Sequence, residues 1–265
     1  MFMSKLGWWL PFLVLLLFGV TAVNGWAAEC SLETLKGGYG LDERGTIVAL
    51  SPPLPFVTSG IIFYDGNGKL SGNETTSLGG GPMPGTFTGT YTVNSDCTYS
   101  DSVVVSPSGT LLNHEGTIAG DGISREVHVI ETDPGVVSVA TIKKTPVGRC
   151  SLATLKGTYA LFGNGEILVP NTPPILVAQA GIVTFDGAGS FSGEDTASTG
   201  GSVTPAANFT GTYSVQPDCR ASAVIHSIVG DILEEGVITG EGEFKGFHGI
   251  FTSLGWAFAQ TLKRQ

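Results

Sequence analysis

Two histidines and two glutamates stand at matching places of the chain, 120 residues apart. His128 corresponds to His248, and Glu115 corresponds to Glu235. A histidine beside a carboxylate can act as a general base whose ring the carboxylate orients. Repetition alone does not indicate catalysis, because a repeated fold also repeats its structural residues. We favour strand histidines that are satisfied by local hydrogen bonds, so these four residues are only weak catalytic candidates.

The remaining ionisable residues carry still weaker indications. His114 and His226 have no counterpart in the other half of the chain and are expected at the surface. Glu74 and Asp195 do match one another, each before a threonine. A single carboxylate per half is usually solvated, so neither is expected to react.

One stretch resembles the start of a calcium-binding loop, namely Asp65-Gly66-Asn67-Gly68. Lys69 and Thr76 then occupy positions where such a loop needs oxygen ligands, so we expect a β-turn there. The chain also contains no nucleophile elbow, phosphate loop, dinucleotide fingerprint or zinc-protease helix. We therefore expect neither a metal nor a cofactor, and the indication for an enzyme is weak.

The chain uses one sequence pattern twice. CSLETLKGGYG begins at Cys30 and CSLATLKGTYA begins at Cys150, and the spacing after each is nearly the same. The linker between the copies, Thr145-Pro146-Val147-Gly148-Arg149, is too short and stiff for a free tether. The repeat predicts two domains in fixed relation, with boundaries at 29–145 and 146–265.

The four cysteines occupy matching places in the two copies. Cys97 follows GTYTVNSD and Cys219 follows GTYSVQPD. The repeat therefore selects Cys30–Cys97 and Cys150–Cys219 from the three connectivities that four cysteines allow. Metal binding is disfavoured, because no Cys-x-x-Cys spacing occurs and no histidine lies near a cysteine in sequence.

Residues 1–28 have the pattern of a secretory signal. Lys5 gives a positive start, residues 10–18 form an apolar run, and Gly25-Trp26-Ala27 offers small residues for cleavage. An uncleaved membrane anchor is the alternative, although the apolar run is short for a hydrocarbon core of about 30 Å. We expect a secreted or periplasmic protein with no membrane span after cleavage, in a compartment where cysteines pair.

Composition excludes some partners. Charged residues make up 14% of the chain and the net charge is −10. With no excess of Lys and Arg to neutralise phosphates, nucleic acid is excluded as a partner, as is electrostatic docking on anionic lipid. Frequent Gly, Thr, Ser and Val favour strands and tight turns.

The clearest predicted strand is Thr86 to Val93, where aromatic and apolar residues alternate with threonines. About eight such strands follow one another in each copy, which predicts an all-β protein of two tandem antiparallel barrels. One apolar face gathers the aromatic residues that either fill each barrel or line an apolar pocket, and we favour filling. They are Tyr39, Phe87, Tyr91, Tyr159, Phe209 and Tyr213.

Two resemblances accompany this pattern. An early Gly-x-Tyr and a late basic residue resemble the Gly-x-Trp and Arg of calycin-type barrels, which implies that architecture. The residues concerned are Gly37 and Tyr39 with Lys143 or Lys144, and Gly157 and Tyr159 with Lys263 or Arg264. The order Cys-Ser-x-x-Thr-Leu-Lys-Gly-x-Tyr, Phe-x-Asp-Gly-x-Gly, Gly-Thr-Tyr-x-Val-x-x-Asp-Cys also resembles a secreted domain of environmental bacteria, which is largely uncharacterised.

These observations favour an exported, non-enzymatic protein whose barrels form a binding or structural module. A small apolar ligand is the partner that such an interior would accept, because eight-stranded barrels hold one small ligand or packed side chains. Two alternatives remain open. One is a barrel enzyme of the isomerase or cyclase type, similar to allene oxide cyclase, and the other is a cell-surface adhesion module.

Overall fold

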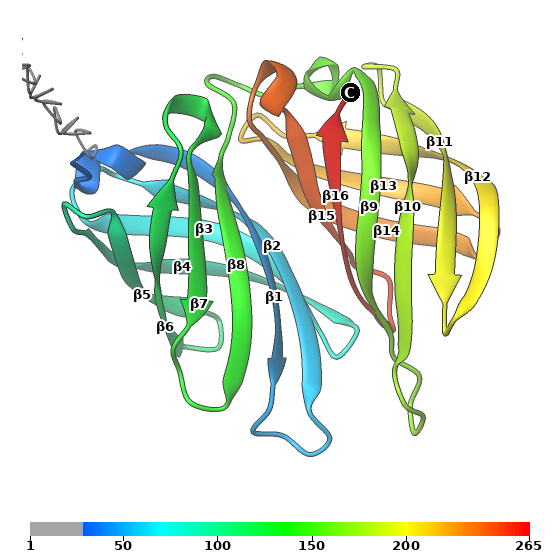
Figure 1. Ribbon diagram of the computed structural model, residues 1–265, viewed down its shortest axis with the longest axis horizontal. Coiled ribbons are helices and arrows are strands. Elements are labelled where there is room, and N and C mark those ends of the chain that lie inside the picture. Colours follow the sequence, from blue (N-terminus) through cyan, green and yellow to red (C-terminus); the bar gives the residue numbers. More distant parts are fainter. Residues whose placement is uncertain (1–28) are drawn as a thin grey trace, which may run out of the picture.

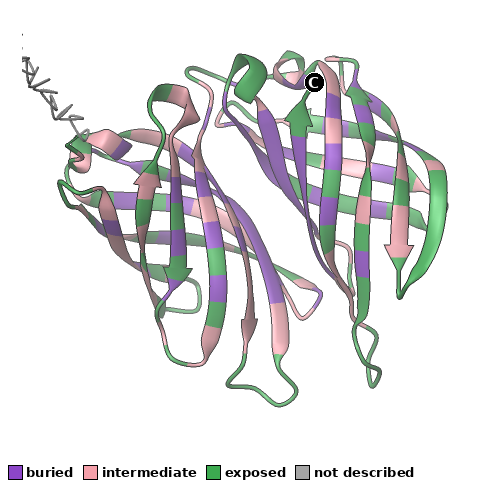
Figure 2. Cartoon of the chain, viewed as in Figure 1, coloured by how far each residue is buried: buried purple, intermediate pink, exposed green. Residues whose placement is uncertain are grey.

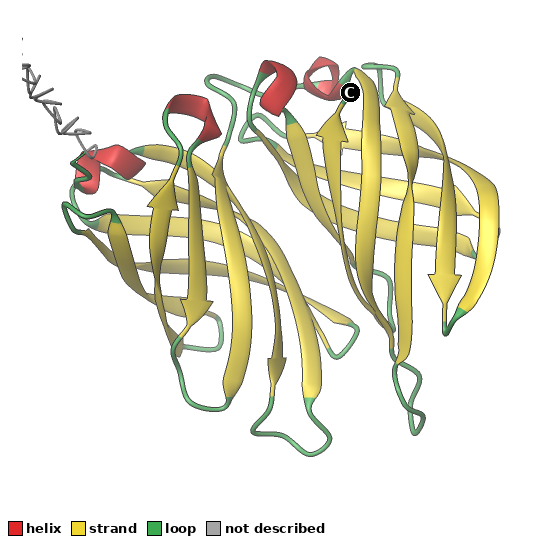
Figure 3. Ribbon diagram, in the orientation of Figure 1, coloured by secondary structure: helices red, strands yellow, loops and turns green. Residues whose placement is uncertain are grey.

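The computed structural model describes residues 29–265, which form two closed β-barrels side by side (Figure 1). Strands make up nearly all of both barrels, and the helices are short turns (Figure 3). The predicted all-β fold of two tandem antiparallel barrels is confirmed. The predicted signal, residues 1–28, lies outside the described residues. No helix among residues 29–265 combines the length and apolar character needed to cross a membrane.

Each barrel has eight antiparallel strands in sequence order, and its first strand pairs with its last. The first barrel contains β1 (Gly37–Ile47), β2 (Leu54–Tyr64), β3 (Lys69–Leu78), β4 (Gly81–Val93), β5 (Thr98–Ser106), β6 (Thr110–Ala119), β7 (Glu126–Glu131) and β8 (Val136–Lys144). The second contains β9 (Gly157–Ile167), β10 (Ile175–Phe185), β11 (Ser190–Thr199), β12 (Ser202–Val215), β13 (Arg220–Ser227), β14 (Gly230–Thr239), β15 (Gly246–Phe251) and β16 (Trp256–Arg264). The 3₁₀ helices are η1 (Leu32–Leu35), η2 (Gly122–Ser124), η3 (Leu152–Leu155) and η4 (Gly242–Phe244).

The alternation of aromatic residues and threonines along β4 gives the strand one face for the barrel interior and one for solvent. Phe87 and Tyr91 are buried on the inner face, whereas Thr88 and Thr92 are exposed outside. Gly72 on β3 pairs with Phe87, and a Cβ there would collide with the ring. The glycine therefore makes room for an aromatic side chain in the narrow interior.

A short helix closes one end of each barrel. In the first barrel, Leu35 of η1 is fully buried and the Tyr91 hydroxyl donates a hydrogen bond to the carbonyl of Leu32, at 3.0 Å. Tyr213 makes the same 3.0 Å bond to Leu152 of η3 in the second barrel. The helices thus act as plugs that the aromatic side chains hold in place.

Both predicted disulfides are present. Cys30 is bonded to Cys97 and Cys150 to Cys219, so every cysteine is paired within its own barrel. Each bridge ties the segment before a plug helix to the turn that follows the fourth strand of that barrel.

Basic residues of the last strands lie beside the first-strand tyrosines. Lys144 Nζ lies 5.7 Å from the centre of the Tyr39 ring, and Arg264 pairs with Tyr159 in the strand register. Lys144 and Arg264 are thus the late basic residues that lie beside the tyrosines of the two early Gly-x-Tyr motifs.

The outer face of β1 and β2 contacts β14, β15 and β16 of the second barrel. Val57, Ile250 and Ala259 form a small apolar cluster between the barrels. Ile250 is fully buried, while Ile130, at the same place in the first barrel, is 53% exposed. Figure 2 shows β15 as an almost unbroken run of buried residues, because one side meets its own core and the other meets the first barrel.

Candidate functional site

The two histidines expected as weak catalytic candidates lie outside the barrels. His128 is half exposed and its Nε2 lies 3.3 Å from Glu126 on the same strand. His248 is buried between the barrels, where its Nδ1 lies 3.5 Å from Asp42 of β1. The repeated position therefore has two different surroundings.

The glutamates at repeated positions also point outward. Glu115 is exposed on β6, whereas Glu235 on β14 accepts a 2.6 Å hydrogen bond from Thr75 of the other barrel. Within residues 29–265, no hydrogen bond joins His128 to Glu115 or His248 to Glu235. The four candidates do not come together as a base and an orienting carboxylate.

All six aromatic residues expected on the inner face are buried there. Phe209 and Tyr213 line a cavity in the second barrel, and Phe87 lines a much smaller one in the first. The other three are Tyr39, Tyr91 and Tyr159, which fill the closed ends. The inward aromatic side chains thus fill the closed end of each barrel and line the cavity in the rest of its interior.

The second barrel holds a cavity of about 150 Å³. Its wall is mainly apolar and includes Phe191, Phe209, Ile225 and Phe247. Small side chains such as Ala223 leave the space open. The interior of this barrel is therefore partly hollow and largely aromatic.

A short polar chain interrupts this apolar wall. The Gln179 side-chain amide donates to Gln260 at 2.8 Å, and the Gln260 amide donates to Glu234 Oε1 at 2.5 Å. Glu234 is 4% exposed, and burial raises its pKa from 4.5 to about 8. At neutral pH Glu234 is therefore mostly a neutral carboxylic acid that can donate a hydrogen bond. Glu234, Gln260 and Gln179 all border the cavity.

The interior of the first barrel differs, and here the expected surface position of His114 is wrong. His114 points inward from β6, its Nδ1 lies 2.7 Å from Asp101 Oδ1, and the two side chains are 12% and 5% exposed. The period-two rule places Leu112, His114 and Gly116 on one face of β6. Sequence reasoning missed this because Leu111 and Leu112 are both apolar, which leaves the inward face undecided.

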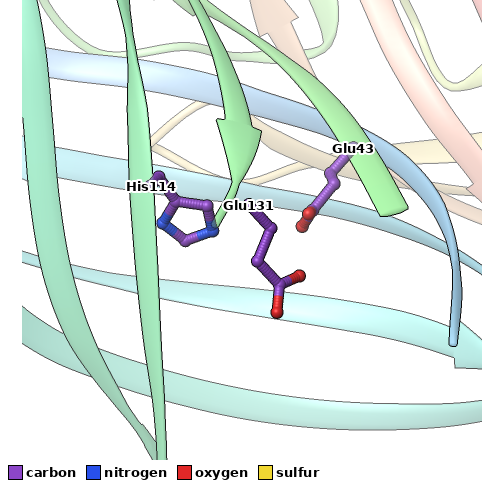
Figure 4. A group of neighbouring side chains, drawn as sticks. All are labelled: Glu43, His114 and Glu131. Atoms are coloured by element: carbon purple, nitrogen blue, oxygen red, sulfur yellow. The ribbon is translucent and has the colours of Figure 1, made fainter. Parts of the chain in front are cut away.

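Glu43 of β1 and Glu131 of β7 approach His114 inside the same barrel (Figure 4). One ligand atom from each of the three lies within 4.8 Å of the others. Glu43 and Glu131 are both 8% exposed, and each has a buried Oε1 without a hydrogen-bond partner. The cavity beside Glu43 and His114 measures about 40 Å³.

Burial and mutual charge shift the protonation of this cluster. Burial raises the pKa of Glu43, and it raises the pKa of Glu131 to about 7. Burial lowers the pKa of His114, but the hydrogen bond to Asp101 and the nearby carboxylates outweigh this and raise it to about 9. Burial therefore favours the neutral form of both glutamates, whereas the carboxylates around His114 favour its protonated form.

Glu74 and Asp195 were expected to be solvated, and the structure places both at the inner wall. Glu74 borders the small cavity of the first barrel, and burial raises its pKa to about 7. Asp195 borders the larger cavity of the second barrel, and burial raises its pKa too. Equivalent carboxylates thus mark the same end of both interiors.

No family model matches the chain, and no curated protein is similar to it. Among solved structures, it is similar to a protein of unknown function from the DUF3598 family of Nostoc punctiforme. The identity is 14%, the match covers 89% of this chain and 100% of that one, and the TM-score is 0.25.

Proposed function

We propose that this is an exported binding protein whose second barrel holds one small, largely apolar molecule. The cavity of about 150 Å³ carries the proposal, because it lies inside a closed barrel and is lined mainly by aromatic and aliphatic side chains. Export is supported by the two disulfides, which are typical of secreted and periplasmic proteins. Each barrel having its own bridge also supports the repeat boundaries 29–145 and 146–265.

Cavity size and chemistry narrow the ligand class. Apolar protein cavities of about 150 Å³ bind benzene-sized molecules. Glu234 in its neutral form and the Gln260 amide add hydrogen-bonding groups at one side of the wall. We therefore propose a single-ring molecule with one neutral oxygen, such as a phenol or a ring ketone.

Ligand-observed NMR with toluene, phenol and benzoate tests this proposal. Phenol should bind most tightly, toluene should bind more weakly, and benzoate should bind least because its charge meets a desolvated wall with two carboxyl groups. Replacing Glu234 by Gln should lower the affinity for phenol to about that for toluene. Absence of binding by phenol and toluene at millimolar concentration would refute a ligand site of this class.

Glu234 also favours one alternative, an isomerase or cyclase type of barrel enzyme. A buried carboxyl group that is neutral near pH 7 can polarise a carbonyl or an epoxide as a general acid. If the protein turns over such a ligand, Glu234→Gln should abolish the reaction, while alanine at His128 and His248 should leave it. Loss of the reaction in the histidine variants, with activity retained in Glu234→Gln, would instead indicate that the histidines are catalytic.

A further inference from the structure

We propose that the first barrel binds one divalent transition-metal ion through Glu43, Glu131 and His114. The three side chains come from β1, β7 and β6, which are separate in sequence and meet only because the barrel closes. Figure 4 shows all three projecting into the interior. A carboxylate oxygen from each glutamate and one imidazole nitrogen make a mixed oxygen and nitrogen ligand set.

Unpartnered oxygens are the observation that points to a cation. Glu43 is 92% buried, being 8% exposed, and its Oε1 receives no hydrogen bond; the same holds for Glu131 Oε1. A buried carboxylate oxygen without a hydrogen-bond partner is costly, since it has lost its water. A divalent cation would give both of these oxygens a ligand bond in place of the water that burial removed.

The surroundings of His114 match those of a metal-binding histidine. Its Nδ1 lies 2.7 Å from Asp101 Oδ1, so the N–H at Nδ1 donates to that carboxylate, and a metal ion would take the place of the proton at Nε2. Metal-bound histidines commonly donate their other N–H to a carboxylate, which fixes the ring. Asp101 in turn accepts a 2.5 Å hydrogen bond from the Tyr99 hydroxyl, and Tyr99 lies 3.0 Å from the Tyr64 hydroxyl. The hydrogen-bond network that orients the His114 ring therefore extends into the aromatic core.

Geometry and cavity size set the class of ion. Metal–ligand bonds of about 2.1 Å place tetrahedral ligand atoms roughly 3.4 Å apart, so atoms within 4.8 Å of one another need to close by up to about 1.4 Å. A glutamate rotamer change covers that distance. The adjoining cavity of about 40 Å³ has room for water as a further ligand and not for an organic substrate. An imidazole ligand favours Zn²⁺, Fe²⁺ or Ni²⁺ over Mg²⁺ and Ca²⁺.

The second barrel supplies an internal comparison. Strand equivalence places Gly163 at the position of Glu43, Glu234 at that of His114 and Phe251 at that of Glu131. The imidazole and both glutamates of the first barrel are thus absent from the same positions of the repeat. The proposal predicts one ion per chain, bound in the first barrel.

Calorimetric titration of the chelator-treated protein with Zn²⁺ tests the site. We expect one Zn²⁺ per chain, at least tenfold weaker binding after Glu43→Gln or Glu131→Gln, and binding 10- to 100-fold weaker after Asp101→Asn. Glu115→Gln, beside His114 in sequence but outside the barrel, should change nothing. Ca²⁺ and Mg²⁺ should not compete.

Thermal melting separates a metal site from a structural cluster. Without metal, Glu43→Gln and Glu131→Gln should melt at or above the temperature of the unchanged protein, because each removes an unpartnered carboxylate. Zn²⁺ should then raise the melting temperature of the unchanged protein and of Glu115→Gln, but not that of the two inner variants. Failure of the protein to bind Zn²⁺ at 1 mM, or an unchanged affinity for Zn²⁺ after Glu131→Gln, would overturn the proposal.

Discussion

His114 and Glu234 occupy the same position of the sixth strand in their respective barrels, and both side chains point into the interior. The backbone frame is the same, yet one interior holds a packed ionic cluster and the other an open apolar cavity. Neighbouring positions explain the difference. Asp101 beside His114 corresponds to Ala223 beside Glu234, so the second barrel loses a charged partner and gains space.

Filling the cavity should abolish ligand binding without harming the fold. Ala223→Leu adds three carbon atoms to the wall of a space of about 150 Å³, so phenol binding measured by NMR should fall below detection. Stability should be unchanged or slightly raised, since the new side chain fills a void. Ala178→Leu, on the exposed outer face of β10, is the matched control and should bind phenol normally. Normal binding by Ala223→Leu would place the ligand elsewhere.

The protonated state of Glu234 should make stability depend on pH. Its pKa rises from 4.5 in the unfolded chain to about 8, so the folded state holds a proton that the unfolded chain releases over this range. Its contribution is therefore complete below pH 4.5 and is lost as pH rises through 8. The free energy of unfolding of the unchanged protein, relative to Glu234→Gln, should fall by about 5 kcal/mol at most.

Urea unfolding at pH 5 and pH 8.5 measures this difference, and other titrating groups cancel because both proteins share them. Glu235→Gln removes the neighbouring carboxylate of β14, which is exposed on the outer face, and is the matched control. An equal pH slope in the unchanged protein and in Glu234→Gln would contradict a raised pKa at this residue.

Because the barrels contact one another, Ile250 should contribute far more to stability than Ile130, the equivalent residue of the first barrel. Ile250 is fully buried between the barrels and Ile130 is 53% exposed. Ile250→Ala should cost about 2–4 kcal/mol, whereas Ile130→Ala should stay within about 0.5 kcal/mol. Chemical denaturation of both variants tests this. Equal effects would mean that the barrels do not contact one another in solution as they do here.

Loss of a disulfide should destabilise its own barrel. The Cys150–Cys219 bridge spans 69 residues, and in the chain-entropy model such a crosslink stabilises by about 4 kcal/mol. Replacing both cysteines by serine should therefore lower the urea midpoint of the second barrel, while reductant should have no further effect on that barrel. A midpoint that matches the oxidised unchanged protein would refute a stabilising role.

Much of the fold follows from local pattern. The alternation of Phe87 and Tyr91 with threonines is a property of neighbouring residues, and it specifies which face of β4 is buried. The repeat likewise specified the disulfide pairing, since Cys97 and Cys219 follow the same motif. His114 escaped this reasoning because two adjacent leucines left the inward face of its strand ambiguous.

By itself, the amino-acid sequence determined the two all-β repeats, their strands, the disulfide within each repeat and the inward face of aromatic side chains. Each of these features depends on residues that are near in sequence or on the repeat itself. Only the tertiary structure decided that Glu43, His114 and Glu131 meet. It also decided that His128 is half exposed while His248 is buried. These outcomes depend on barrel closure and on the contact between barrels, which bring distant strands within a few ångströms of one another. The spacing of neighbouring residues in the sequence does not predict such contacts.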